Sequence, residues 1–210
     1  MEATGEVEKF DALDEALQEL TISEEFILPE GIHGPPQLQN QLRTLLSKYK
    51  ECFRSMVSST PAKIKPFSFT IDSTKWFGSR INNSRYRTQS AAKNAEIDRQ
   101  IQLLLDLKII RKSKRDRYSQ VHLVPKPNDK WRFCLDYRFL NSCTDMEGGV
   151  IPMIYELLQR IGQQKPKFFA VIDFTSGYHQ APIAEDTIPF TAFITHRGVY
   201  EWVRLPMGWD

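Results

Sequence analysis

Residues 121–138 read V-H-L-V-P-K-P-N-D-K-W-R-F-C-L-D-Y-R, and their pattern predicts a β-hairpin. Residues 121–124 form an apolar run, 125–130 contain the turn formers, and 131–138 alternate between apolar and polar side chains. Because of this alternation, one set of side chains of the second strand faces a core and the other set lies on the opposite face. The core-facing set is Trp131, Phe133, Leu135 and Tyr137, and the opposite set is Arg132, Cys134, Asp136 and Arg138. At about 3.3 Å per residue the two arginines would lie about 20 Å apart, so this face is either an exposed polar surface or one that follows a phosphate backbone.

Apolar residues at helical spacing predict helices on both sides of this hairpin. Their apolar faces are Val7, Phe10, Leu13, Leu17 and Leu20 in an N-terminal leader; Leu38, Leu42, Leu45, Leu46, Tyr49 and Phe53 in a second helix; Ile97, Ile101, Leu104, Leu105 and Leu107 in a helix over 89–110; and Ile154, Leu157, Leu158 and Ile161, expected to face inward, in a short helix that begins at Pro152. A Pro- and Gly-rich linker through residue 36 separates the first two helices. The leader helix is expected to dock on its own chain, and partner binding is the alternative.

The remaining segments predict extended chain and strands. Residues 58–87 lack a helical period and are expected to be extended, ending in a polar loop. The continuous apolar run F-F-A-V-I over 168–172 predicts a strand buried on both faces. Two further strands are expected at 191–195 and 199–205, joined by a turn at 196–198.

The charge of the chain is unevenly distributed. Its 210 residues are 41% hydrophobic and 26% charged, a globular composition that excludes a disordered or collagen-like chain, and the net charge is only +2. Residues 1–30 hold ten acidic side chains and one lysine, whereas residues 43–138 hold 22 Lys and Arg against eight Asp and Glu. A cluster of five basic residues follows the 89–110 helix: Arg111, Lys112, Lys114, Arg115 and Arg117. The basic region over residues 43–138 fits either a surface that binds a polyanion or an ordinary solvated surface.

Cysteine usage and hydropathy indicate an intracellular location. Cys52, Cys134 and Cys143 are too few and too widely spaced to predict a disulfide framework or a C-x-x-C metal pair. No apolar run approaches the roughly 20 residues of a membrane helix, and the acidic N-terminus is unlike a secretory signal. The sequence therefore predicts a cytoplasmic or nuclear protein without a membrane segment.

Asp173 is the one candidate metal ligand that the residues alone suggest. A carboxylate at the end of a buried strand is held with little freedom, which suits a hard cation such as Mg²⁺. The alternative is that Asp173 caps a helical turn over 175–178. The four histidines lack metal-ligand spacing, and the chain has no G-x-S-x-G, P-loop or G-x-G-x-x-G motif.

Seven motifs, in this order and spacing, resemble those of reverse transcriptases, most of all the gypsy-type long-terminal-repeat retrotransposon polymerases. They are L-V-P-K-P (123–127), W-R-F-C-L-D-Y-R-F-L-N (131–141), I-P-M-I (151–154), F-F-A-V-I-D-F-T-S-G-Y-H-Q (168–180), T-A-F-I-T (191–195), G-V-Y-E-W (198–202) and L-P-M-G (205–208). The resemblance covers about residues 45–210. It implies an α+β right-hand polymerase fold, with fingers plus an incomplete palm, and RNA-directed DNA polymerase (nucleotidyltransferase) activity in the complete enzyme.

The resemblance also implies roles for single residues. Asp173 matches the first catalytic aspartate, which binds divalent Mg²⁺ or Mn²⁺, and Phe174 matches the neighbour whose carbonyl completes a metal shell. Arg132, with Lys126 as a companion, matches the contact to the incoming dNTP, and Tyr178 matches the aromatic gate beneath its sugar. Asp136, Arg138 and Asn141, supported by Tyr137, match the face that binds the RNA or DNA template-primer. Pro206, Met207 and Gly208 match the loop over the nascent base pair.

The chain departs from the family pattern after residue 208. It holds no Asp-Asp pair, whereas the family has a Y-x-D-D hairpin, a thumb and usually an RNase H domain. A single carboxylate cannot hold two Mg²⁺ ions beside a triphosphate, so we expect a truncated enzyme that is inactive alone. The expected organisation is a leader helix and linker (1–36), fingers with two helices and the hairpin (37–145), a partial palm (146–185), and strands returning to the fingers (186–210). Glu185 and Asp186 are expected to be solvated.

Two other functions stay open from the sequence. The basic fingers could be a noncatalytic nucleic-acid-binding module, or the chain could be an unfolded retrotransposon-derived remnant. The second alternative follows from the 168–172 strand, because an exposed apolar edge invites aggregation.

Overall fold

The structure, a computed structural model, describes residues 34–53, 57–125, 131–145, 153–167, 169 and 171–208. The predicted leader helix lies outside these residues. So do Lys126 with the rest of the hairpin turn, Pro152, and positions 168 and 170 of the predicted buried strand. In the part of the chain that is described, no helix is both long enough and apolar enough to span a membrane.

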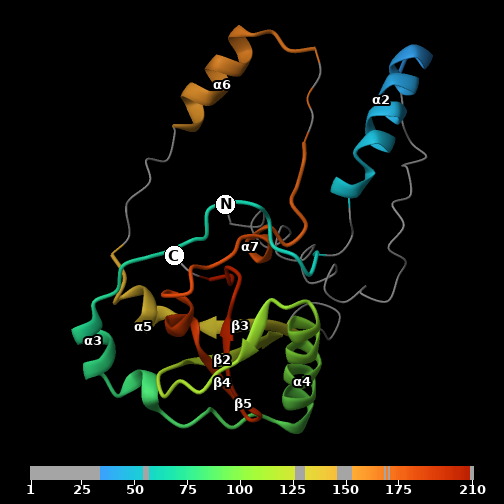
Figure 1. Cartoon of the computed structure of the whole chain (residues 1–210). Helices are drawn as coiled ribbons and strands as arrows, with labels where there is room; N and C mark the ends of the chain where they lie inside the picture. The colour runs from blue at the N-terminus through green and yellow to red at the C-terminus, as the bar shows by residue number, and fades with distance from the viewer. Residues whose placement is uncertain are drawn as a thin grey trace.

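The predicted hairpin forms one edge of a five-stranded sheet (Figure 1). β2 (Ser119–Pro125) and β3 (Trp131–Asp136) pair antiparallel, as expected. β4 (Phe193–Thr195) runs parallel to β2, and β5 (Gly198–Trp202) and β1 (Ile110–Lys112) complete the order β1-β5-β4-β2-β3. The predicted turn between β4 and β5 is confirmed, with Gly198 at φ 125°. The sheet thereby joins strands from distant parts of the chain, as where Arg111 of β1 pairs with Glu201 of β5, 90 residues away.

One face of the sheet is covered by α4 (Ala91–Asp106), within the predicted helix over 89–110. The Ser90 hydroxyl caps its first turn by accepting from the Lys93 N–H. The apolar stripe of α4 enters the main core with Ile97, Ile101 and Leu104 at 5% exposure or less. Trp131, Phe133 and Leu135 of β3 pack against this core, which confirms the predicted face of the hairpin.

A second core lies beside the first and is built around a helix that the sequence did not predict. α3 (Ser73–Gly78) interrupts the segment expected to be extended, because the Asp72 carboxylate accepts from the Lys75 N–H and caps it. Its Trp76 is 1% exposed and stacks on Phe139 at 5.8 Å between ring centroids. α5 (Arg138–Asn141) follows β3 directly and contributes Leu140 to this core. The second strand therefore ends at Asp136, and Arg138 lies on a helix, not on the strand face with Arg132.

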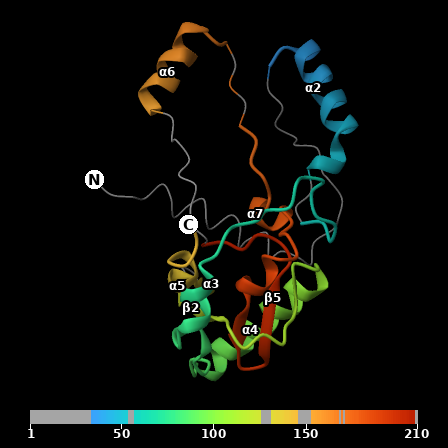
Figure 2. The same cartoon turned by 60° about the vertical axis from the view of Figure 1, so that its left-hand side comes forward.

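Two amphipathic helices stand apart from the sheet in both views (Figures 1 and 2). α2 (Pro36–Lys48) and α6 (Ile154–Gln163) form where the sequence predicts helices, but every residue of either helix is at least partly exposed. Ile154 is 74% and Leu158 62% exposed, so the expectation that the α6 stripe faces inward is wrong. Helical spacing sets which face is apolar but not what covers it.

The predicted buried strand is also wrong at its described positions. Phe169, Val171 and Ile172 are 77%, 95% and 77% exposed and do not belong to a strand. A strand becomes buried only when neighbours pair with its backbone and cover its faces. Among the described residues no strand does so for this segment.

Candidate functional site

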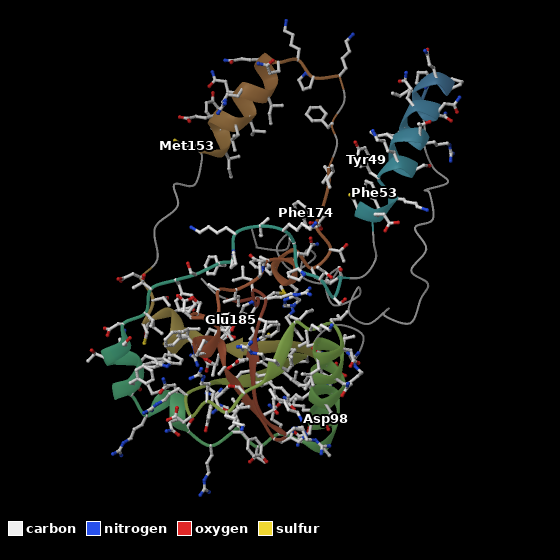
Figure 3. The ribbon with its side chains drawn as sticks, viewed as in Figure 1. Tyr49, Phe53, Asp98, Met153, Phe174 and Glu185 are labelled. Atoms are coloured by element: carbon white, nitrogen blue, oxygen red, sulfur yellow. The ribbon has the colours of Figure 1, made fainter. Side chains whose placement is uncertain are left out.

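Asp173 and Phe174 lie on exposed chain between α6 and α7 (Gly177–Gln180), where Phe174 is seen in Figure 3. Because the preceding residues are not a buried strand, Asp173 is not presented on a rigid strand end as expected. Its Oδ1 accepts from the N–H of Phe174 at 2.9 Å. The alternative, a cap on the next helical turn, is not what the structure has either, since α7 begins after Ser176 without a side-chain cap. The carboxylate is thus open to solvent.

The turn into α7 is sharp. Ser176 is 2% exposed with φ 47°, a left-handed conformation that is uncommon for a residue with a side chain. A Cβ added to Gly177 would lie 3.2 Å from the Cβ of Phe174. The Gln180 side chain closes the turn by donating to the Thr175 carbonyl at 2.7 Å. Tyr178, the candidate sugar-side aromatic, projects from this turn with 51% of its surface exposed.

Arg204 and His179 hold α7 on the sheet, and sequence reasoning missed both. Arg204 is 1% exposed and donates to the carbonyls of Ser58, Ser59 and His179. The His179 ring stacks on Trp202 at 5.2 Å, and its Nδ1 lies 3.1 Å from the Leu205 carbonyl, so Nδ1 carries the proton. Burial lowers the pKa of His179 to about 4. The signal in the sequence was a lone arginine inside the otherwise apolar run 203–206.

Asp136 and Arg138 are brought together at the end of β3. Arg138 donates from Nε and one terminal nitrogen to the two carboxylate oxygens of Asp136, both at 2.8 Å. The hydrogen bonds from Arg138 keep the pKa of Asp136 below its usual value. Asn141 is one turn further, and its side-chain oxygen is buried without a hydrogen-bond partner in the described structure. Tyr137, at 2% exposure, anchors the group by donating to the Thr191 carbonyl at 3.1 Å.

The predicted nucleotide contacts Arg132 and Met207 do not take part in the Asp136–Arg138 group. Arg132 is half-buried on β3 and pairs with Val124 of β2, at the hairpin end of the sheet. Met207 is half-buried in the loop after β5, and Gly208 has φ 85°. The Leu205 N–H donates to the Ala181 carbonyl at 2.9 Å, which ties the start of this loop to the end of α7.

The basic cluster divides into two kinds of residue. Arg111 donates to Glu201 at 2.7 Å and to Glu185 at 3.1 Å, and these hydrogen bonds raise its pKa. Arg117 donates to the carbonyls of Ser79 and Phe77. Both arginines therefore make hydrogen bonds within the protein, although Arg111 is itself exposed, and Glu185 is ion-paired although it is exposed. Lys112, Lys114 and Arg115 are exposed and form the outer part of the cluster.

The metal-binding capacity of the described residues is small. Within them, no three His, Cys, Asp or Glu side chains lie close enough together to hold an ion. Asp173 supplies one carboxylate and Phe174 one carbonyl. Two-metal centres for phosphoryl transfer need carboxylates that bridge or flank both ions, so the described residues do not by themselves fit such a centre.

Comparisons with known proteins agree with the motifs. The family described as reverse transcriptase (RNA-dependent DNA polymerase) matches residues 124–210. The Pol polyprotein of the Drosophila melanogaster transposon opus is 41% identical over 118 residues, which is 54% of this chain and 12% of that protein. The polyprotein of transposon gypsy from the same species is 28% identical over 181 residues, 83% of this chain and 17% of that protein. The chain thus spans less than a fifth of either relative.

Solved structures give the same fold. The foamy viral protease-reverse transcriptase in complex with an RNA/DNA hybrid aligns with a TM-score of 0.65 and 22% identity, covering 96% of this chain and 25% of that one. The same viral protein with double-stranded DNA aligns with a TM-score of 0.63. The mixed sheet and helices are therefore those of the fingers and palm region of reverse transcriptases. Residues 124–210 thus match the reverse transcriptase family, and the chain is similar to the Pol polyproteins of retrotransposons such as gypsy.

Proposed function

We propose that this chain supplies the fingers and the leading part of the palm of an RNA-directed DNA polymerase. In that role the Asp136–Arg138 group and Asn141 face the template strand. Arg132 and Lys126 contact the dNTP triphosphate, Tyr178 lies beneath its sugar, and Met207 with Gly208 borders the nascent base pair. The observation that carries the proposal is the bidentate Asp136–Arg138 pair, which fixes a cation at the end of β3, away from the hairpin turn, in a strongly basic region. A planar guanidinium held in this way suits phosphate oxygens.

Asp173 and the Phe174 carbonyl would hold a divalent ion, Mg²⁺ or Mn²⁺, together with donors other than those described. When bound, such ions stabilise charge on the attacking and leaving oxygens of phosphoryl transfer. The 210 residues contain no Asp-Asp pair, and the described donors do not complete a two-metal set. We therefore assign this chain binding and positioning roles and expect no DNA synthesis from it alone.

A second function, noncatalytic binding of nucleic acid, is favoured by a specific contrast. The donors described for a metal are a single carboxylate and a carbonyl, whereas the basic surface has several exposed cations, Lys112, Lys114, Arg115 and Arg138 among them. Binding through phosphate neutralisation needs only these cations. Both functions therefore begin with binding of nucleic acid. They differ in whether Asp173 is needed to bind a divalent ion and a nucleotide.

One titration series tests both functions. Fluorescence anisotropy of a labelled RNA/DNA hybrid is measured with the 210-residue chain between 50 and 300 mM salt. We expect affinity to fall steeply with salt, and the triple variant Lys112→Ala, Lys114→Ala, Arg115→Ala to lower the slope by about two to three, at about 0.9 per phosphate contact. Arg111 is left intact because it supports the fold. Wild-type chain that shows no salt-dependent binding would contradict both functions.

Asp173→Ala separates the two. If the chain positions nucleotide for a polymerase, adding Mg²⁺ and the dNTP complementary to the next template base should tighten binding of a primed hybrid, and Asp173→Ala should abolish that gain. If the chain only binds nucleic acid, Mg²⁺ and dNTP should not tighten binding of the hybrid by the wild type or by the Asp173→Ala variant. Primer extension with Mg²⁺ and dNTPs should give no product, and measurable synthesis would contradict the expected inactivity.

A further inference from the structure

Arg87, which belongs to none of the sequence motifs, lies with Arg138 on the same carboxylate. Its terminal nitrogen is 3.3 Å from Asp136 Oδ2, the oxygen that also accepts from Arg138. The side chains of Arg87 and Arg138 are 54% and 86% exposed, whereas that of Asp136 is 18% exposed. One largely buried negative charge therefore orients two exposed guanidiniums, which leaves one positive charge in excess and donors directed to solvent.

Gln120 fixes the loop that carries Arg87. It is 8% exposed on β2, and its side-chain oxygen accepts from the Arg87 N–H at 3.1 Å. Its amide nitrogen donates to the Ser84 hydroxyl and to the Arg85 carbonyl, both at 3.1 Å. One buried amide thus makes hydrogen bonds along residues 84–87, and the loop has little freedom to move Arg87 away from Asp136.

The two arginines border a pocket of about 490 Å³, within the range of roughly 300–1,000 Å³ that holds small molecules. Its walls are mixed. Ile81 and Phe139 are apolar, Ser84 and Ser142 bring hydroxyls, and Ile81 is 66% exposed. The Arg117 hydrogen bonds to the Ser79 and Phe77 carbonyls brace the chain that leads into this wall. A nucleoside has the same mixture of flat apolar surface and hydroxyls.

We propose that Arg87 and Arg138 bind one phosphate of a single-stranded nucleic acid and that the adjoining pocket receives the nucleoside next to it. The inference rests on the proposed nucleic-acid binding and makes it specific, because it assigns Arg87 as a phosphate ligand and Gln120 as the positioning residue for it. The excess positive charge supplies affinity, and the pocket supplies a preference for a strand that carries bases.

The test compares Arg87→Ala with Arg85→Ala in the full chain. Arg85 lies two residues earlier on the same exposed loop but is not among the pocket-lining residues, so its loss controls for charge alone. The probes are a fluorescent 15-mer of deoxythymidine and an abasic 15-mer with the same number of phosphates. Arg87→Ala should weaken binding of the thymidine strand about fivefold and lower the salt slope by about 0.7, and Arg85→Ala should do much less.

Three more variants separate positioning, charge and the contribution of the pocket. Gln120→Leu keeps both arginines, so it should weaken binding and leave the salt slope near that of the wild type. Arg87→Lys should likewise keep the slope but lose part of the affinity, because lysine lacks the planar fork. Ile81→Ser should reduce the preference for the thymidine strand over the abasic strand. Matched thermal melting curves check that each variant is folded.

Distinct results overturn distinct claims. Equal effects of Arg87→Ala and Arg85→Ala, with wild-type chain that still binds, would overturn the phosphate site alone. Equal affinity of wild-type chain for the thymidine and abasic strands would overturn the nucleoside pocket. A wild-type chain that binds neither strand at low salt would overturn the inference together with the proposed function.

Discussion

α4 and α6 carry the same kind of apolar stripe, yet they end in opposite environments. Ile97 and Ile101 of α4 are 2% and 5% exposed, whereas Ile154 and Leu158 of α6 are 74% and 62% exposed. α4 lies against the sheet and α6 stands apart from it (Figure 2). Amphipathic spacing therefore predicts a helix and its apolar face, while burial depends on a partner surface elsewhere in the fold.

Deleting a buried ring should destabilise the protein far more than deleting an exposed side chain of α6. Phe193 is fully buried in the sheet and contacts the rings of Phe133, Tyr200 and Trp202. Phe193→Ala should lower the free energy of unfolding by about 3–5 kcal/mol, the usual cost of deleting a buried ring. Leu158→Ala on α6 should change it by less than about 0.5 kcal/mol. Urea unfolding followed by tryptophan fluorescence measures both, and comparable losses would show that α6 is packed in solution.

An intermediate effect concerns pH and the α7 region. The folded pKa of His179 is about 4, below its ordinary 6.5, because the ring is buried. Between pH 4 and 6.5 the unfolded chain binds a proton that the folded chain does not. The stabilisation from the neutral ring is therefore fully present above pH 6.5. The free energy of unfolding falls by about 1.4 kcal/mol per pH unit, or roughly 3 kcal/mol in all, as the pH drops to 4. Hydrogen bonds from arginines keep the Asp98 and Asp136 pKa values low, so those carboxyls lose their contributions below this window.

Thermal melting at fixed ionic strength between pH 7 and 4 measures the slope. His179→Phe keeps an aromatic ring against Trp202 but cannot titrate, so it is the matched control. Its melting temperature should be much less dependent on pH over the same range. An identical pH dependence in the variant and the wild type would show that His179 is not the group responsible.

Sequence reasoning predicted the elements that have local signals. The hairpin followed from its alternation, α4 from its helical spacing, and the turn at Gly198 from its position between two apolar runs. It failed where the outcome depends on distant residues: nothing near 168–172 says whether other strands pair with it, and nothing near Arg204 says that three carbonyls converge on it. At the site, the motifs indicated Asp136 and Arg138, but Arg87 reaches them from a distant loop whose backbone hydrogen-bonds to Gln120 of β2.

The smallest effect concerns how the two kinds of helix begin. α3 has a side-chain cap, since Asp72 accepts from the Lys75 N–H at 2.9 Å, and it carries the buried Trp76; α6 begins after Met153 without such a cap. Asp72→Ala should therefore cost about 1 kcal/mol of global stability, because the first turn of α3 is coupled to the core through Trp76. Asp72→Asn keeps the acceptor oxygen and should retain most of that stability.

Met153→Asp gives α6 an acceptor at the same position, and it should slow amide exchange within α6 while leaving the global unfolding free energy unchanged. If it raised global stability as much as Asp72→Ala lowers it, α6 would be coupled to the folded body, and the contrast between α4 and α6 would not hold in solution.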